Sequence, residues 1–365
     1  SVSTGALTVK TWFRARTTSG VCAIAVSNVV EVSVSPKVVV KTITGNTPNV
    51  CFGGDRTLTL GLASVGTIQW QRNVTSSATA PLATDTNWSD LENAIAPTTA
   101  TNAATPLALT NLTETAWYRV KFTSGSCAVG YSVAVRLGVD PIAVVGTVSE
   151  NASEVCSGLS TTLNLTTPNV GIIKWQKSIN YDANNPTLAT WATVAGTATS
   201  VSTGALTATT WFRAQTSSGV CTVANSNVVQ VVVTPKPVSK AISGNTPNLC
   251  QGFDRTLTLA TASVGFIQWQ RNVTTSATAP LAADTNWSDL GSVIAPTGAT
   301  NAANSLDLTN VTQTAWYRVK FTSGSCAEGY SVAVRLAVDP TAVVGTVSVS
   351  TPEVCSGSSA TLTLS

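Results

Sequence analysis

The sequence predicts an all-β protein, built as a tandem array of antiparallel β-sandwich domains that together form an elongated rod. Three observations support this prediction. Charged residues make up 10% of the 365 residues, against about 25% in typical soluble proteins. A long segment recurs almost unchanged later in the chain. Several short runs alternate apolar and polar residues with the two-residue period of a half-buried strand.

The sequence repeats itself at an offset of 199 positions. The segment SVSTGALTVKTWFRARTTSGVC at 1–22 returns as SVSTGALTATTWFRAQTSSGVC at 200–221. All eight cysteines obey the same offset, in the pairs Cys22 and Cys221, Cys51 and Cys250, Cys127 and Cys326, and Cys156 and Cys355. Because a repeat of this length usually corresponds to whole structural units, the period defines the domain organisation.

Prolines that end strand-like runs divide the period in two. They fall at Pro36, Pro141, Pro235 and Pro340, at intervals of 105, 94 and 105 positions. We therefore predict the end of a type B domain at 1–36, a type A domain at 37–141 and a type B domain at 142–235. A second type A domain follows at 236–340, and the start of a type B domain at 341–365. Neither end piece can bury a core alone, so we expect the chain to continue in both directions.

Two strand-like runs show the two-residue period clearly. In TIQWQR, Ile68 and Trp70 share one face, and the glutamines share the other. In AWYRVKF, Tyr118, Val120 and Phe122 point one way, while the tryptophan, arginine and lysine between them point the other. Such patterns are typical of antiparallel strands with one face on the core.

The same runs resemble immunoglobulin-like sandwiches. A tryptophan follows a cysteine at the same spacing in three units, and this resembles the core tryptophan on the third immunoglobulin strand. The stretches Leu112-x-Glu114-x-Ala116-x-Tyr118 and Val311-x-Gln313-x-Ala315-x-Tyr317 resemble the immunoglobulin tyrosine corner. Valine replaces the second immunoglobulin cysteine, and type B units have phenylalanine in place of tyrosine. We expect core positions for Trp70, Trp175, Trp269, Tyr118, Tyr317, Phe13 and Phe212.

The cysteines indicate disulfides and an extracellular location. An even number of cysteines in a chain without histidine argues against zinc, and disulfides persist in oxidising compartments. We expect pairing within units, as Cys51–Cys127, Cys156–Cys221 and Cys250–Cys326, with the partners of Cys22 and Cys355 outside the chain. The alternative joins neighbouring units, as Cys51–Cys221 and Cys156–Cys326, because the two cysteines of an immunoglobulin-like unit would lie at opposite ends.

Composition argues against several function classes. The net charge of +3 is weak and dispersed, which argues against nucleic acid as a partner. No apolar stretch approaches the ~20 residues of a membrane span. Without histidine there is no Ser/His or Cys/His pair, so we expect no enzyme activity, no catalytic residue, no cofactor and no metal. The repeated DTNWSD loops, with Asp85, Asn87 and Asp90, could hold Ca²⁺, but we favour turn capping.

Tryptophans outside the predicted core are the candidates for contacting a ligand. Trp88, Trp117, Trp287 and Trp316 could form an aromatic row that stacks on sugar rings. The interpretation we favour is packing beneath a neighbouring strand or an arginine, because the same residues recur in every module. An arginine lies two residues after the tryptophan of each W-[FY]-R stretch, as Arg14 after Trp12, Arg119 after Trp117, Arg213 after Trp211 and Arg318 after Trp316.

The complete module resembles a known family. V-C-[SF]-G-x-x-x-T-L-T-L, the W-Q strand and T-x-W-[FY]-R-x-x-T-S-G-x-C resemble repeats of giant cell-surface adhesins from gliding Bacteroidota-type bacteria. The resemblance implies type IX secretion, display on the outer surface, contact with outer-membrane secretion and motility machinery, and a load-bearing filament in attachment and gliding. Two alternatives remain open: weak multivalent polysaccharide binding by the repeats, and a structural sheath or cell–cell contact protein.

Overall fold

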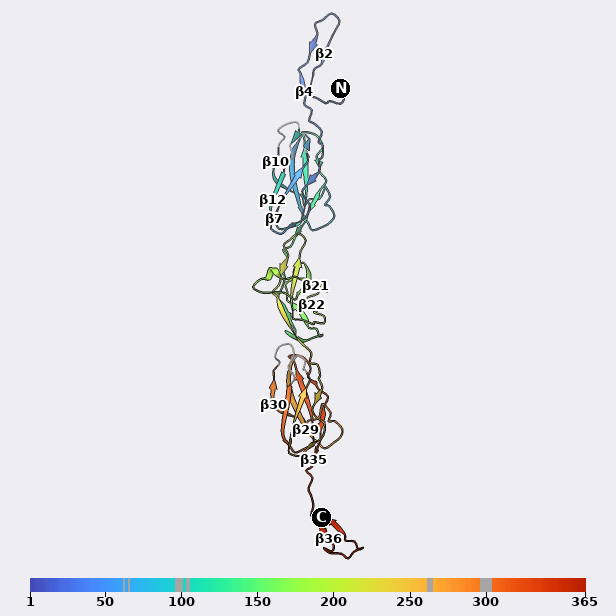
Figure 1. Ribbon diagram of the computed structural model, residues 1–365. Helices are drawn as coiled ribbons and strands as arrows, with labels where there is room; N and C mark the ends of the chain where they lie inside the picture. Colours follow the sequence, from blue (N-terminus) through green and yellow to red (C-terminus); the bar gives the residue numbers. More distant parts are fainter. Residues whose placement is uncertain (62, 65, 96–100, 103–105, 261–264, 296–303) are drawn as a thin grey trace.

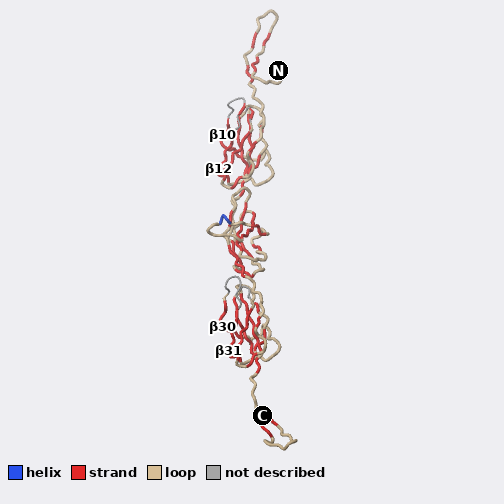
Figure 2. Tube along the Cα trace, viewed as in Figure 1, coloured by secondary structure: helices blue, strands red, loops and turns tan. Residues whose placement is uncertain are grey.

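The computed structural model describes residues 1–61, 63–64, 66–95, 101–102, 106–260, 265–295 and 304–365. Three β-sandwiches stack end to end along one axis, and a small hairpin-like piece lies at each end of the rod (Figure 1). Almost all regular structure is strand (Figure 2). The predicted fold class, a tandem array of immunoglobulin-like sandwiches, is confirmed by the strand order within each unit. The described residues include no helix that is long and apolar enough to cross a membrane.

The first type A unit contains twelve strands within 37–141, including two short ones beside undescribed residues. They are β5 (Ile43–Thr44), β6 (Val50–Cys51), β7 (Gly54–Leu60), β8 (Ala63–Ser64), β9 (Thr67–Val74), β10 (Ser89–Ile95), β11 (Thr101–Asn102), β12 (Pro106–Leu112), β13 (Ala116–Thr123), β14 (Gly130–Tyr131), β15 (Val135–Leu137) and β16 (Val139–Asp140). One sheet has the order β12-β7-β5, and the other has the order β10-β9-β13, with β14 and β15 both paired to β13.

The type B unit has the same plan within 142–235. Its elements are β17 (Val148–Glu150), β18 (Glu154–Cys156), β19 (Thr162–Leu165), β20 (Ile172–Ser178), the 3₁₀ turn η1 (Pro186–Leu188), β21 (Ala192–Val194), β22 (Ser200–Ser202), β23 (Thr210–Ser217), β24 (Ala224–Asn225) and β25 (Val229–Thr234). The sheets have the orders β17-β19-β22 and β18-β25-β23-β20-β21.

The second type A unit repeats the first within 236–340. Its strands are β26 (Ile242–Ser243), β27 (Leu249–Cys250), β28 (Phe253–Leu259), β29 (Phe266–Val273), β30 (Ser288–Ile294), β31 (Asn304–Val311), β32 (Ala315–Thr322), β33 (Gly329–Tyr330), β34 (Val334–Leu336) and β35 (Val338–Asp339). The sheet orders β26-β28-β31 and β30-β29-β32-β33 match those of the first unit.

The end pieces form hairpins without a core. Strands β1 (Thr11–Phe13) and β4 (Val30–Val32) pair with each other, as do β2 (Arg16–Thr17) with β3 (Ala25–Val26) and β36 (Val347–Val349) with β37 (Leu362–Leu364). No residue of 1–36 or 341–365 is buried. Phe13, expected in a core, is therefore only half-buried, because this piece has no opposite sheet to cover it.

Each complete unit has its own core, organised around one tryptophan. Trp70 is 2% exposed and lies opposite Val120 in the β9–β13 register. Valine thus occupies the place of the second immunoglobulin cysteine and packs directly beside the tryptophan. Trp175 and Trp269 hold the same position in the other two units, and Tyr118, Tyr317 and Phe212 are also fully buried. The period-two pattern of these strands therefore identified the core face correctly.

Candidate functional site

The junctions between sandwiches bring together the cysteines of neighbouring units. The first strand of each unit is split between the two sheets: β5 pairs with β7, whereas β6 runs parallel to β16, the last strand of the unit. The parallel register places Cys51 opposite Asp140, directly before Pro141. The first cysteine of the unit therefore lies at the end from which the chain leaves.

The second cysteine of a unit lies at the opposite end. Cys221 follows β23 in a tight turn, where its backbone N–H donates to the carbonyl of Ser218 at 2.9 Å. Because β23 runs antiparallel to β25, the last strand of the unit, this turn lies at the end where the chain enters. Cys221 thus faces the exit of the preceding sandwich.

Both disulfides of the structure cross a junction. Cys51 of the first type A unit bonds Cys221 of the type B unit, with Cα atoms 4.9 Å apart. Cys156 of the type B unit bonds Cys326 of the second type A unit, with Cα atoms 4.7 Å apart. The expected pairing within units is therefore wrong, and the alternative between neighbours is correct. The reason is topological, because the two cysteines of one sandwich lie a whole domain length apart.

The remaining cysteines are unpaired in this chain: Cys22, Cys127, Cys250 and Cys355. Cys127 nevertheless occupies the same surroundings as the bonded Cys326. Its Sγ lies 3.4 Å from the carbonyl oxygen of Ser35 and 3.6 Å from that of Pro36. The equivalent distances from Cys326 are 3.5 Å to Thr234 and 3.6 Å to Pro235. The three junctions therefore share one geometry.

A carboxylate reinforces the first of the two bonded junctions. Asp140 Oδ2 accepts a hydrogen bond from the backbone N–H of Val220 at 3.0 Å. Gly219, just before, has φ of +48°, and a Cβ on it would meet that carboxylate oxygen at 1.8 Å. The glycine of the T-S-G-x-C motif is thus required both by the turn and by the close approach of the neighbouring domain.

The second bonded junction uses a different acid in the same way. Glu154 Oε1 accepts from the backbone N–H of Ser325 at 2.7 Å. A Cβ on Gly324 would meet Glu154 Oε1 at 2.1 Å. Sequence reasoning missed Asp140 and Glu154, which lie on different strands of their units. The glycine before each second cysteine was the available signal, because it marks a tight contact.

The outer face of the larger sheet carries an arginine in each complete unit, which is buried in the two type A units and half-buried in the type B unit. The guanidinium of Arg119 lies between two rings, 4.1 Å from the centroid of Trp88 and 4.2 Å from that of Tyr131. Its Nε donates to Gln71 Oε1 at 2.7 Å, and its Nη1 donates to the carbonyl of Ala83 at 3.0 Å. We call these five residues the arginine clamp. Burial lowers the pKa of Arg119, an effect opposed by the nearby Tyr131.

The second type A unit repeats the clamp, and the type B unit retains its arginine, glutamine and tryptophan. Arg318 lies 4.1 Å from Trp287 and 4.2 Å from Tyr330, and its Nε donates to Gln270 at 2.8 Å. In the type B unit, Arg213 lies 4.1 Å from Trp191. The rings that pack on arginine in the type A units therefore include Trp88 and Trp287, which are half-buried.

Trp117 and Trp316 do not form an exposed aromatic row. They are 8% and 9% exposed, and their indole N–H groups donate to the backbone carbonyls of Ser77 and Ser276 at 3.0 Å. The suggested sugar-stacking role of these two residues is wrong, because the connection between β9 and β10 folds over the outer face of the sheet. The alternation of apolar and polar residues had placed these tryptophans on the outer face correctly, but it did not show that a connecting segment covers this face.

The DTNWSD loop uses its acids within the protein. Asp85 Oδ2 accepts from the backbone N–H of Leu82 at 2.8 Å, and Asp90 Oδ1 accepts from Gln71 Nε2 at 2.6 Å. Among the described residues, no group of three or more histidine, cysteine or acidic side chains could hold a metal ion. Asp85 therefore caps the turn that begins at Leu82, which is the interpretation we favoured for this residue.

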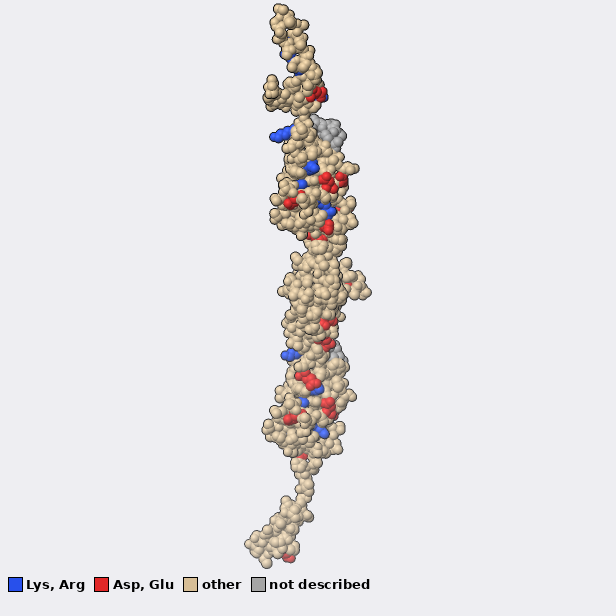
Figure 3. Space-filling view, turned by 180° about the vertical axis from the view of Figure 1, so that it is seen from behind, with Lys and Arg blue, Asp and Glu red and all other residues tan. Residues whose placement is uncertain are grey.

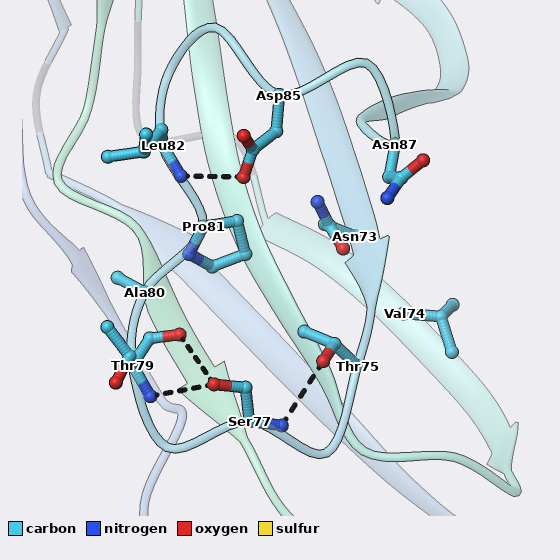
Figure 4. Close-up of a pocket in the computed structure, with 10 residues that line it drawn as sticks. All are labelled: Asn73, Val74, Thr75, Ser77, Thr79, Ala80, Pro81, Leu82, Asp85 and Asn87. Carbon is cyan, nitrogen blue, oxygen red and sulfur yellow. Dashed lines mark hydrogen bonds between the residues drawn. The ribbon is translucent and has the colours of Figure 1, made fainter.

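The same loop borders an open hollow of about 480 Å³ (Figure 4). Its lining is mostly small and polar, and includes Asn73, Thr75, Ser77, Asp85 and Asn87. The second type A unit repeats it with a volume of about 470 Å³. The acidic and basic side chains of the rod are scattered over the face seen in Figure 3, without a large patch of one sign.

Comparison with known proteins identifies the family. The family described as "Domain of unknown function (DUF8696)" matches residues 1–36, 39–141, 144–235 and 238–340. The chain belongs to this family. Its four matched segments end at Pro36, Pro141, Pro235 and Pro340. No curated protein matches the sequence.

Solved structures similar to the chain include two titin fragments and murine CEACAM1b. An I67–I69 I-band fragment of titin is 10% identical, with a TM-score of 0.46, covering 85% of this chain and 100% of its own. An E-to-A variant of titin I67–I69 is 11% identical, with a TM-score of 0.45, covering 80% and 95%. Murine CEACAM1b is 10% identical, with a TM-score of 0.32, covering 53% and 99%. The fold assignment rests on the strand order of this chain.

Proposed function

We propose that these repeats form the load-bearing stalk of a large, secreted, cell-surface adhesin, used in surface attachment and gliding motility. The observation that carries the proposal is the crossing of both bonded junctions by a disulfide. A disulfide inside a domain stabilises that domain alone, whereas one between domains fixes the path of the rod.

The short junctions support a stiff rod. Only residues 141–147 separate β16 from β17. Within this segment, Val144 forms an antiparallel bridge with Val170, with backbone N–O distances of 2.8 and 3.1 Å. The junction is therefore attached to the next sandwich by backbone hydrogen bonds, a disulfide and a carboxylate. Few rotatable bonds remain to act as a hinge, which suits a part that holds another at a distance.

Export and surface display rest on chemistry and on the family resemblance. Disulfides that hold a protein together persist outside the reducing cytoplasm. The resemblance of the module to repeats of giant gliding-bacterium adhesins supplies the finer part of the proposal: type IX secretion, anchoring at the outer membrane and movement by the motility machinery.

Polysaccharide binding by the repeats is the weaker alternative. Its main support was an exposed aromatic row, and Trp117 and Trp316 are buried. The hollows beside Asp85 and Asp284 are open and polar, with no exposed aromatic ring among their lining residues. A flat aromatic platform is the usual means of binding the C–H face of a sugar. We therefore place adhesion outside these repeats.

The test is made on cells that express the full protein. Thiols are blocked before lysis, and disulfide-linked peptides are mapped by mass spectrometry. Antibody fragments against the type A unit are located on intact cells by electron microscopy. We expect the Cys51–Cys221 and Cys156–Cys326 peptides, surface labelling, and a shorter reach of the adhesive tip after in-frame removal of one A–B pair. Reduced cysteines or absence of surface label would refute the stalk.

A second assay separates the stalk from the binding module. The oxidised chain is applied to polysaccharide arrays and to glass, with a known carbohydrate-binding protein as the positive control. We expect no saturable binding by the folded chain. Saturable binding that is lost in Asn87→Ala, while the fold is retained, would make the repeats themselves adhesive.

A further inference from the structure

The order of the bonded cysteines along the chain has a mechanical consequence. The sequence order is Cys51, Cys156, Cys221 and Cys326, and the bonds join the first to the third and the second to the fourth. The two loops therefore interleave, instead of standing side by side or one inside the other. Interleaved loops create two covalent nodes, one at each end of the type B sandwich.

Three chain segments connect these nodes in parallel: 51–156, 156–221 and 221–326. Each segment starts at one end of the type B sandwich and finishes at the other. The segment 156–221 is the shortest of the three, whereas the other two are equal in length, because each also passes through part of a type A sandwich. Tension applied along the rod is shared among them, and the shortest becomes taut first.

We infer that the interleaved disulfides form a covalent bypass that limits how far the rod lengthens when its domains unfold. The inference deepens the proposed stalk function and rests on it for its biological purpose. Between the nodes, the taut connection 156–221 contains about 65 residues, and it reaches about 220 Å when fully extended. Without the bonds, the stretch 51–326 contains about 275 residues and would extend to about 950 Å.

In a longer array with the same bonds, the repeat makes the covalent path through the bypass shorter for each A–B pair. The segments 127–156 and 326–355 each run from the second cysteine of one unit to the first cysteine of the next. They contain the last strands of one sandwich, the junction and the first strands of the next. They are largely extended already, so they give little slack. Tension would then pass along two parallel covalent paths, which we call rails. Each rail contains only about 29 residues per A–B pair, and this number limits how far the array can lengthen.

The arrangement explains why the cysteines avoid the usual immunoglobulin position. A buried bridge between the two sheets would protect one core and leave the junctions unprotected. Bonds between neighbours instead leave each core to its own packing, around Trp70, Trp175 or Trp269, and assign the load to the strands that run through the junctions. The sandwiches then act as spacers that keep the rails straight.

Force spectroscopy on the full 365-residue chain, held at its two ends, tests the inference. The shortest covalent path through the oxidised wild type consists of 1–51, 156–221 and 326–365, whereas the reduced wild type extends over its whole length. Reduction should therefore release about 210 residues of hidden length, or about 720 Å. Release of no length on reduction would overturn the inference.

Single variants give a signature that belongs to interleaving alone. Cys221→Ser and its matched partner Cys51→Ser each leave one bond, which closes a loop with a sequence separation of 170. Two bonds together hide about 210 residues, well short of twice the length that one bond hides, because their loops overlap. Breaking both bonds would release twice the single-bond length only if the loops stood side by side.

Cys127→Ser is the negative control, since Cys127 is unpaired in this chain. It should leave the hidden length of the oxidised protein unchanged. Pairing within units would instead bond Cys127 to Cys51, and Cys127→Ser would then lose about 76 residues of hidden length. That result would overturn the inference.

The outcomes separate the inference from the proposed function. Hidden length of the expected size in a protein that never reaches the cell surface would refute the stalk and leave the bypass standing. A surface-displayed stalk whose oxidised chain extends as far as the reduced chain would refute the bypass alone. Folding of each variant is checked by the fluorescence of the core tryptophans before it is pulled.

Discussion

Replacing Arg119 with alanine should destabilise the first type A unit strongly and locally. The guanidinium is 4% exposed, lies between Trp88 and Tyr131, and donates to Gln71 Oε1 and the carbonyl of Ala83. Hydrogen bonds from a charged donor contribute about 1.5–3 kcal/mol each, and stacking on a ring adds about 0.5–2 kcal/mol. The charge also loses hydration on burial, which offsets part of this gain.

We expect a net loss of about 4 kcal/mol in the free energy of unfolding of that unit. The loss includes the cost of leaving the carbonyl oxygen of Gln71 without its donor in a buried position. Because about 1.4 kcal/mol is a factor of ten, exchange of the most protected amides should accelerate by about a thousandfold. Arg119→Lys keeps the charge but loses the planar fork that fits between two rings, and its stability should lie between those of wild type and Arg119→Ala.

Hydrogen–deuterium exchange with mass spectrometry measures the effect one unit at a time. Peptides from β9 and β13 report the mutated unit, and peptides from β29 and β32 report the second type A unit as an internal control. The reciprocal variant Arg318→Ala should exchange the roles of the two units. Less than a threefold change in the mutated unit, or an equal change in both units, would refute a local structural role for the clamp.

Three further predictions concern the outer face, a junction and pH. Trp117→Ala should lower the thermal stability of its unit by several degrees without changing retention on polysaccharide columns, because the indole is buried; reduced retention by a folded variant would contradict this. Asp140→Ala should lower the free energy of unfolding by about 1 kcal/mol and accelerate hydrogen exchange at the Val220 amide, as measured by NMR. Unchanged exchange at Val220 would exclude a stabilising role for its hydrogen bond to Asp140. Lys320 and Tyr330 lower the pKa of Glu328 below its ordinary value of 4.5, so this carboxylate contributes stability that is present above pH 4.5 and lost as the pH falls through its lowered folded-state pKa. Glu328→Val, which places the residue of the first type A unit at this position, should abolish that acid-dependent part of the unfolding curve, and an unchanged curve would disprove the assignment.

The sequence determined the architecture because its signals are local. A long exact period and regularly spaced prolines require no knowledge of distant contacts. Alternation in TIQWQR and AWYRVKF identified the core face, since neighbouring side chains of a strand must point to opposite sides. Trp70 and Val120 meet in the core as a direct consequence. The core role of the aromatic residues in complete units followed from the same pattern.

The tertiary structure decided what covers the outer face. Alternation placed Trp117 and Arg119 away from the core, and that orientation is correct. Both are nevertheless buried, because the connection between β9 and β10 folds back over them. Tyr131 completes the clamp from β14, a strand paired with β13. A connecting segment has no period, so its path cannot be read from the spacing of its residues.

The tertiary structure also decided the disulfides. The sequence supplied two cysteines per unit, and we expected them to pair within each unit, with pairing between neighbours as the alternative. The parallel pairing of β6 with β16 places Cys51 at the exit of its unit, and the turn after β23 places Cys221 at the entrance of the next. Which cysteines meet depends on the direction of strands from opposite ends of a unit's sequence. Composition and spacing give two cysteines per unit, and only the folded chain shows which of them are bonded to each other.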